Sequence, residues 1–160
     1  MRLEELIDLY GNAVLRLCTL YLGDRHLAED AFQETFLKAW KKQDSFRGES
    51  SIKTWLMHIA VNTCRDMLRS GWFRTMRRSQ PVETLLSLSS GGDLQEETAV
   101  RDAVLHLPGI YREVILLHYD QGMNTREIAA SLGLPPNSVS TRLRRARALL
   151  EKELKEGIDE

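Results

Sequence analysis

The residues between Asn137 and Leu150 combine four arginines with several small hydroxyl side chains and contain no acid. In a helix, one face of this stretch carries the polar side chains: Ser138, Thr141, Arg142, Arg144, Arg145 and Arg147. The other face carries apolar residues at spacings of three and four, which predicts one buried stripe: Val139, Leu143, Ala146 and Leu150. Guanidinium groups so arranged can bind phosphates and base edges in the major groove of DNA. The alternative is a solvated helix in an ordinary bundle, because charge patterning alone is only suggestive.

The preceding residues predict the first half of a helix-turn-helix, over about 124–150. Thr125 is expected to cap a short helix, and Glu127 suits its N-terminus. Gly133 permits the left-handed backbone that ends a helix. The pair Pro135 and Pro136 cannot continue that helix but can begin the next one. The short helix, the double proline and the acid-free face together favour DNA binding.

Catalytic chemistry finds little support in the sequence. The acidic residues form no obvious pair, and the four histidines are scattered along the chain: His26, His58, His106 and His118. We therefore expect no enzyme, metal, cofactor or small-molecule substrate. Cys18 and Cys64 lie in apolar patterns without metal-type spacing, which is typical of reduced core thiols in a cytoplasmic protein.

The 160 residues allow one domain or two small ones, and helical periodicity throughout predicts an all-α fold. The net charge is −1, but the charge is unevenly distributed. Residues 1–80 carry net +3, residues 81–99 net −4, and residues 100–160 are balanced. We expect domains at 1–78 and 98–156, joined by a flexible acidic linker at 79–97. No apolar run is long enough to span a membrane, and no signal-peptide pattern opens the chain.

Three helices are expected in the first domain, over 2–22, 25–42 and 51–70. In the second of these helices, over 25–42, four apolar residues at i+4 spacing are predicted to be buried: Ala28, Phe32, Phe36 and Trp40. Its outer face carries polar residues and one leucine: Asp30, Gln33, Glu34, Leu37 and Lys41. An exposed leucine needs no explanation, although an apolar centre with an acidic rim would also suit a partner surface.

The loop after the second helix carries Phe46 beside Arg47, a pair that can stack on an unpaired base. Composition alone favours burial of Phe46 and solvation of Arg47. The third helix, capped by Ser51, is expected to expose a basic stripe that attracts phosphate: Lys53, His58, Asn62, Arg65 and Arg69. Arg74, Arg77 and Arg78 extend it. In the second domain we expect helices at 98–107 and 111–119, and fraying from Glu151 onward.

These motifs resemble the extracytoplasmic-function sigma factors of bacterial RNA polymerase, a group of the sigma-70 family. The stretches AEDAFQETFLKAW and FRGESSIKTWLMHIAVNTCRDMLR are similar to sigma region 2. The stretches LPGIYREVILLHY and TREIAASLGLPPNSVSTRLRRARALL are similar to sigma region 4. The resemblance covers nearly the whole chain. It implies a protein without a catalytic centre that binds core polymerase and recognises the −10 and −35 promoter elements.

The resemblance also assigns roles to individual residues. Contacts with the clamp helices of the largest polymerase subunit are implied for Asp30, Gln33, Glu34 and Leu37. Contacts with the −10 element are implied for Phe46, Arg47, Lys53, Asn62, Arg65 and Arg69. Contacts with the −35 element are implied for Asn137, Ser138, Ser140, Thr141, Arg144 and Arg145. Ser140 stands where some relatives have a larger basic residue, so no −35 sequence is transferred.

A cognate anti-sigma factor, often membrane-bound in this group, is a further implied partner. The main alternative is a free-standing helix-turn-helix regulator that binds operator DNA without polymerase. It leaves the basic third helix and the outer face of the second unexplained. An interaction protein such as an anti-sigma antagonist is disfavoured by the arginine-rich helix.

Overall fold

The computed structural model describes residues 1–48, 50–70 and 94–158, and every regular element in these ranges is helical. An N-terminal unit contains α1 (Leu3–Leu22), α2 (Arg25–Lys42), the 3-10 turn η1 (Gln43–Ser45) and α3 (Ile52–Arg69). A C-terminal unit contains α6 (Leu94–His106), α7 (Gly109–Ile115), the π-helical turn η2 (Leu116–Asp120), α8 (Thr125–Leu132) and α9 (Pro136–Ile158). The all-α prediction is confirmed.

Helix ends in the N-terminal unit follow from local chemistry. Gly23 ends α1 in the left-handed conformation, with φ of 68°. The side chain of Asp24 then accepts a hydrogen bond from the backbone of Leu27 and caps α2. Ser51 caps α3 in the same way, as predicted. The expected helices at 2–22, 25–42 and 51–70 therefore agree with the structure to within one residue.

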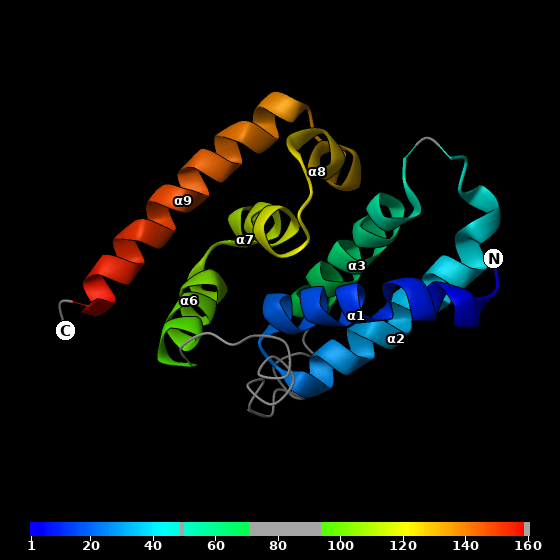
Figure 1. Ribbon diagram of the computed structural model, residues 1–160, viewed down its shortest axis with the longest axis horizontal. Helices are drawn as coiled ribbons and strands as arrows, with labels where there is room; N and C mark the ends of the chain where they lie inside the picture. Colours follow the sequence, from blue (N-terminus) through cyan, green and yellow to red (C-terminus); the bar gives the residue numbers. More distant parts are fainter. Residues whose placement is uncertain (49, 71–93, 159–160) are drawn as a thin grey trace.

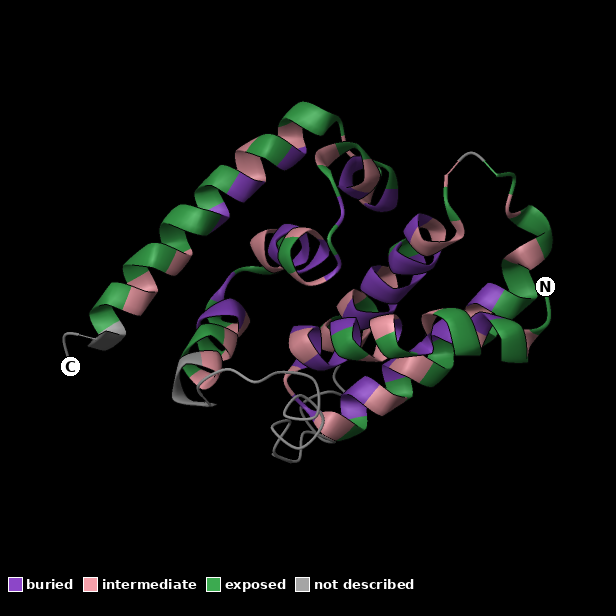
Figure 2. Ribbon diagram, viewed as in Figure 1, coloured by how far each residue is buried: buried purple, intermediate pink, exposed green. Residues whose placement is uncertain are grey.

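The core continues from one unit into the other. In the N-terminal unit α1 packs on α2 and α3, and in the C-terminal unit α9 packs on α6, α7 and α8 (Figure 1). Between the units, α3 contacts α8, and α1 contacts α6 and η2. Buried side chains from both units form a single hydrophobic cluster, in which α9 buries one face and exposes the other (Figure 2).

Several boundaries and burial predictions are wrong. The last helix continues to Ile158 instead of fraying from Glu151, and α6 begins at Leu94, inside the predicted linker. Trp40 is 49% exposed because the i+4 ladder drifts around α2 and leaves the core at its end. The cap of α8 is Asn124, one residue before Thr125. The predicted linker residues 79–93 and Arg74, Arg77 and Arg78 lie outside the described residues.

Candidate nucleic-acid interface

A groove between α2 and α3 gathers the residues assigned to polymerase contact. Its volume is about 430 Å3, and its lining includes Asp30, Gln33, Glu34 and Leu37, together with Asp66 and Met67 of α3. Leu37 is 48% exposed at this groove, so the prediction that it faces outward is confirmed. Sequence reasoning missed the part that α3 plays, because helix periodicity does not say which helices are neighbours.

A second, basic cleft lies between the same two helices. Its volume is about 290 Å3, and it is lined by Lys38, Lys42, His58, Ile59, Asn62, Arg65, Asp66 and Arg69. The cleft brings together three residues predicted to contact the −10 element, Asn62, Arg65 and Arg69. The lysines were missed, although their i, i+4 spacing near the basic end of α2 places both on one face.

Hydrogen bonds fix the orientation of Asn62 in this cleft. Its Nδ2 atom lies 3.2 Å from Nε2 of His58, and its Oδ1 atom accepts a hydrogen bond of 3.2 Å from Nη1 of Arg65. The amide is thus held by two neighbours on its own helix. An oriented amide can offer a donor and an acceptor to a base edge.

The loop before α3 holds its aromatic residue against a second aromatic ring. The ring of Phe46 is half-buried, and its centroid lies 5.2 Å from that of Trp55, with an interplanar angle of 44°. Arg47 beside it is exposed. Phe46 is therefore not in the core, but its ring is packed against Trp55 and is not fully exposed. Neither Phe46 nor Arg47 lines the basic cleft that contains Asn62.

The helix-turn-helix forms as α8 and α9. Asn124 and Glu127 make a reciprocal capping box, with hydrogen bonds of 2.9 and 3.0 Å, and Gly133 ends α8 with φ of 68°. In α9, Val139, Leu143 and Ala146 of the predicted stripe are buried, whereas Leu150 at its end is half-buried.

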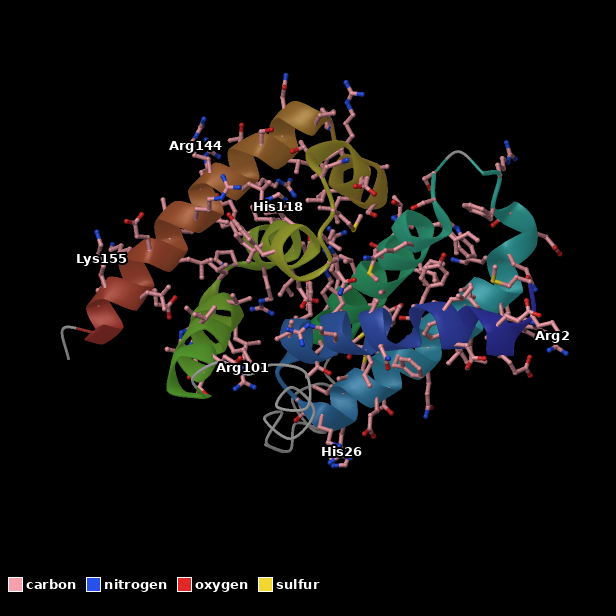
Figure 3. All side chains as sticks on the ribbon, viewed as in Figure 1. Arg2, His26, Arg101, His118, Arg144 and Lys155 are labelled. Carbon is pink, nitrogen blue, oxygen red and sulfur yellow. The ribbon has the colours of Figure 1, made fainter. Side chains whose placement is uncertain are left out.

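The residues predicted to read the −35 element lie on the other face of α9. Asn137, Ser140, Arg144 and Arg145 are exposed, whereas Ser138 and Thr141 are half-buried. Arg144 projects from α9 away from the rest of the chain (Figure 3). Arg147 turns instead toward η2, where its Nε donates a hydrogen bond of 2.5 Å to the hydroxyl of Tyr119.

Two residues of α3 that were predicted to be exposed are half-buried, because they contact the C-terminal unit. Nζ of Lys53 donates a hydrogen bond of 2.9 Å to the carbonyl oxygen of Gln121. Arg65 forms a two-point ion pair with Glu113 of α7. The prediction of exposure is wrong for both residues, because it treated the two units as separate bodies.

Glu113 lies at the centre of a buried polar cluster that sequence reasoning did not find. The hydroxyl of Tyr21 donates a hydrogen bond of 2.9 Å to the same carboxylate. Burial, followed by the Glu113 charge, raises the pKa of Tyr21 well above its ordinary value. The hydrogen bond with Glu113 raises the pKa of Arg65, whereas burial lowers the pKa of Arg112 nearby. One acid in the apolar run YREVILL was the only signal of this cluster.

The two cysteines are buried neighbours on α1 and α3. A hydrogen bond between the thiols, followed by burial, raises the pKa of Cys64 well above its ordinary value. A protonated, buried thiol is a poor nucleophile and metal ligand. Within the described residues, no group of three or more His, Cys, Asp and Glu side chains is placed to hold a metal ion.

Comparisons with known proteins agree with this arrangement. Residues 6–74 match the family model of sigma-70 region 2, and residues 97–150 match that of sigma-70 region 4. The ECF RNA polymerase sigma factor SigW of Bacillus subtilis is 32% identical over 165 residues, covering 95% of this chain and 88% of SigW. The ECF RNA polymerase sigma-E factor of Haemophilus influenzae is 31% identical over 162 residues, covering 93% and 85%.

Two solved structures share the fold over almost the whole chain. The sigma factor RpoE from Bartonella quintana, in complex with the anti-sigma factor NepR, has a TM-score of 0.75 and 27% identity, covering 95% of this chain and 96% of RpoE. CnrH in complex with the cytosolic domain of CnrY has a TM-score of 0.73 and 30% identity, covering 96% and 88%. With both sigma regions matched and sequence similarity over nearly its full length, this chain belongs to the extracytoplasmic-function sigma factors of bacterial RNA polymerase.

Proposed function

We propose that this protein is an alternative sigma factor that binds core RNA polymerase, reads the −10 and −35 elements of its promoters and starts transcription of a stress- or envelope-type regulon. The observation that carries the proposal is one chain with two separate basic surfaces, one on α3 and one on α9, beside an acidic groove with an apolar centre. A free-standing operator-binding regulator needs only the surface on α9.

The groove between α2 and α3 suits a protein partner. Leu37 supplies an exposed apolar centre, and Asp30 and Glu34 supply an acidic rim. Interfaces are commonly built in this way, with an apolar centre surrounded by polar residues. We assign Asp30, Gln33, Glu34 and Leu37 to the clamp helices of the largest polymerase subunit.

The basic cleft suits a single DNA strand with an unpaired base. Lys38, Lys42 and Arg69 supply charge for phosphates, and the held amide of Asn62 supplies the polar pattern that a base edge requires. Phe46 and Arg47 on the adjacent loop, together with Lys53 and Arg65, complete the set assigned to the −10 element. Extruding a base costs a few kcal/mol, which these contacts must offset.

The outer face of α9 suits the major groove at the −35 element. Arg144 and Arg145 can make bidentate contacts with guanine, each worth about 1–3 kcal/mol of discrimination. Ser140 and Thr141 lie on the same face, and Asn137 and Ser138 are in the first turn, where free backbone N–H groups can meet a phosphate.

Partners and location follow from this function. The structural relative RpoE was solved in complex with the anti-sigma factor NepR, and CnrH was solved with the cytosolic domain of CnrY, so we expect an anti-sigma partner here. None of the described helices is long and apolar enough to cross a membrane. We propose that the protein acts in the cytoplasm, where polymerase and promoter DNA are found, and that it acts through binding energy without catalysing a reaction.

Run-off transcription with purified core polymerase tests this function. The template is the DNA upstream of the protein's own gene, with and without the protein. Specific initiation only in its presence supports the proposal. Absence of initiation together with absence of co-elution with core polymerase would favour the free-standing regulator.

A further inference from the structure

The basic face of α3 is in direct contact with the C-terminal unit. Three of its polar groups, Lys53, His58 and Arg65, are hydrogen-bonded to the residue that follows η2, to α8 and to α7. Two of these residues, Lys53 and Arg65, belong to the set assigned to the −10 element, and His58 holds the amide of Asn62. Part of the face proposed to bind a DNA strand is therefore engaged by the chain itself, while the cleft beside Asn62 and Arg69 stays open.

The ion pair between Arg65 and Glu113 places a buried carboxylate against the basic face. Only 2% of the Glu113 side chain and 27% of the Arg65 side chain is exposed. Nε of Arg65 donates to Oε1, and Nη2 donates to Oε2 at 2.5 Å. A guanidinium binds a carboxylate and a phosphate with the same fork of donors, so Glu113 occupies the site that a phosphate would need.

Helix α8 is fastened to α3 by two further hydrogen bonds. Oγ of Ser131 donates to the carbonyl oxygen of Thr54 at 2.8 Å, and Nδ1 of His58 donates to the carbonyl oxygen of Ser131 at 2.6 Å. Ser131 is buried with 1% exposure, so its hydrogen bond to Thr54 is shielded from water, whereas the His58 residue is exposed. Loss of one partner would leave a buried polar group unsatisfied, which destabilises the contact between the units.

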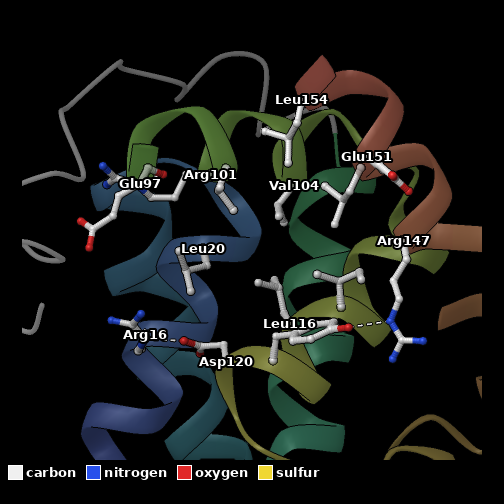
Figure 4. A pocket seen from close by; sticks show the side chains of 14 residues that line it. Arg16, Leu20, Glu97, Arg101, Val104, Leu116, Asp120, Arg147, Glu151 and Leu154 are labelled. Carbon is white, nitrogen blue, oxygen red and sulfur yellow. Dashed lines mark hydrogen bonds and ion pairs between the residues drawn. The ribbon is translucent and has the colours of Figure 1, made fainter. Parts of the chain in front are cut away.

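Helix α1 supplies a second set of contacts between the units. Arg16 pairs with Asp120, and both line an apolar groove of about 760 Å3 that α1 shares with α6, η2 and α9 (Figure 4). Nε2 of Gln121 donates to the carbonyl oxygen of Ala13 at 3.0 Å. A Cβ atom added to Gly23 would lie 2.8 Å from Leu105 of α6, so the end of α1 is closely packed as well.

Other functional surfaces stay open in this arrangement. Leu37 is exposed at the groove assigned to polymerase, and Arg144 and Arg145 are exposed on α9. Closure therefore affects one of the three surfaces and leaves the other two accessible.

We infer that the C-terminal unit acts as a built-in competitor of the −10 strand, with the Glu113 carboxylate in place of a DNA phosphate on Arg65. This inference rests on the proposed function for the identity of the DNA. The closed chain can dock on polymerase through α2, and the units must separate before α3 can bind the non-template strand. Removal of the Glu113 charge shifts the chain toward the open form.

The test compares Glu113→Gln with Asp102→Asn, which removes the same charge from an exposed position on α6. Dyes on Leu9→Cys and Glu156→Cys, one in each unit, report opening of the full chain by energy transfer in the absence of DNA and polymerase. Both positions are exposed, whereas Cys18 and Cys64 are buried. Affinity for a labelled single-stranded oligonucleotide from the non-template strand of the upstream DNA is measured in parallel on the unlabelled variants.

We expect Glu113→Gln to lower energy transfer and to raise oligonucleotide affinity about tenfold, or about 1.4 kcal/mol, with Asp102→Asn unchanged in both. Ser131→Ala, a milder change, should shift both in the same direction and serves if Glu113→Gln fails to fold, as judged by circular dichroism. Unchanged energy transfer in both Glu113→Gln and Ser131→Ala overturns the inference. Opening without a gain in affinity also overturns it. Failure of transcription with altered energy transfer would contradict the proposed function but not the existence of the closed form.

Discussion

Arg65 of α3 and Glu113 of α7 lie 48 positions apart in the chain and form a two-point ion pair between the two sigma regions. The same carboxylate accepts a hydrogen bond from Tyr21 of α1. A buried carboxylate is costly unless its oxygens are satisfied, and here two side chains of the N-terminal unit satisfy it. The acid in an otherwise apolar helix is therefore explained by a contact with the other unit.

Tyr21 gives this contact a pH dependence. Its pKa is raised by burial and by Glu113, so the folded chain keeps the phenol proton at pH values where an unfolded chain has lost it. The contribution of the protonated Tyr21 to the stability of the folded chain is complete below the ordinary tyrosine pKa of about 10. It falls by up to about 1.4 kcal/mol per pH unit as the pH rises above that value. Urea unfolding between pH 8 and 11.5 (about 2 pH units below and 1.5 above the ordinary pKa) should show this decline.

Tyr21→Phe is the matched variant for that measurement. It loses the hydrogen bond to Glu113 and should be less stable at neutral pH by about 1.5–3 kcal/mol, the usual range for bonds to charged groups. Its stability should decline less steeply above pH 10, because the group that releases the proton is gone. An equal decline in both proteins would contradict the role given to Tyr21.

The groove between α2 and α3 predicts the effect of charge at its centre. Leu37→Asp combined with Gln33→Ala should weaken binding to core polymerase at least about tenfold, because a carboxylate replaces the apolar centre of an acidic surface. Leu9→Asp is the control, since Leu9 is 65% exposed on α1 and does not line the groove. The measurement is equilibrium binding of labelled protein to core polymerase, with circular dichroism to check folding. Equal affinities for the double variant and the unchanged protein would refute the assignment.

The α9 assignment predicts a loss of specificity on truncation of one arginine. Arg145→Ala should reduce discrimination between the correct −35 sequence and a scrambled one by about 1–3 kcal/mol, and leave binding to core polymerase unchanged. Lys152→Ala removes a positive charge from an exposed position further along the same helix and should reduce affinity for both DNAs alike. Binding is compared at one fixed salt concentration. Equal losses on both DNAs for Arg145→Ala would show a phosphate contact instead of base reading.

Helix positions could be predicted because the local signals agree with one another. Ser51 caps α3 where the sequence indicated, and the stripe through Val139 and Leu143 is buried as its spacing required. The errors lie at helix ends and at positions such as Trp40, where straight i+4 counting departs from the turn of a real helix.

Contacts between the units could not be predicted in the same way. Lys53 and Arg65 look like ordinary solvated cations in the sequence, and only the three-dimensional arrangement brings Gln121 and Glu113 to them. Lys38 and Lys42 were likewise missed at the basic cleft, because nothing in the sequence of α2 says which of its faces meets α3. Residue types and spacing thus indicate which side chains could bind a ligand, but not which residues of the other unit contact them.

The capping box of α8 predicts that the helix-turn-helix is sensitive to one side chain. Asn124→Ala removes the hydrogen bond to the backbone of Glu127 and should lower the free energy of unfolding by about 1 kcal/mol. Because α8 has only eight residues, it has little helical stability of its own and depends on this cap and on packing against α3 and α9. Asn12→Ala is the control, since Asn12 is exposed inside α1, where alanine favours the helix and should not destabilise it. Urea unfolding compares both variants with the unchanged protein. If Asn124→Ala is as stable as the unchanged protein, packing alone holds α8 in place.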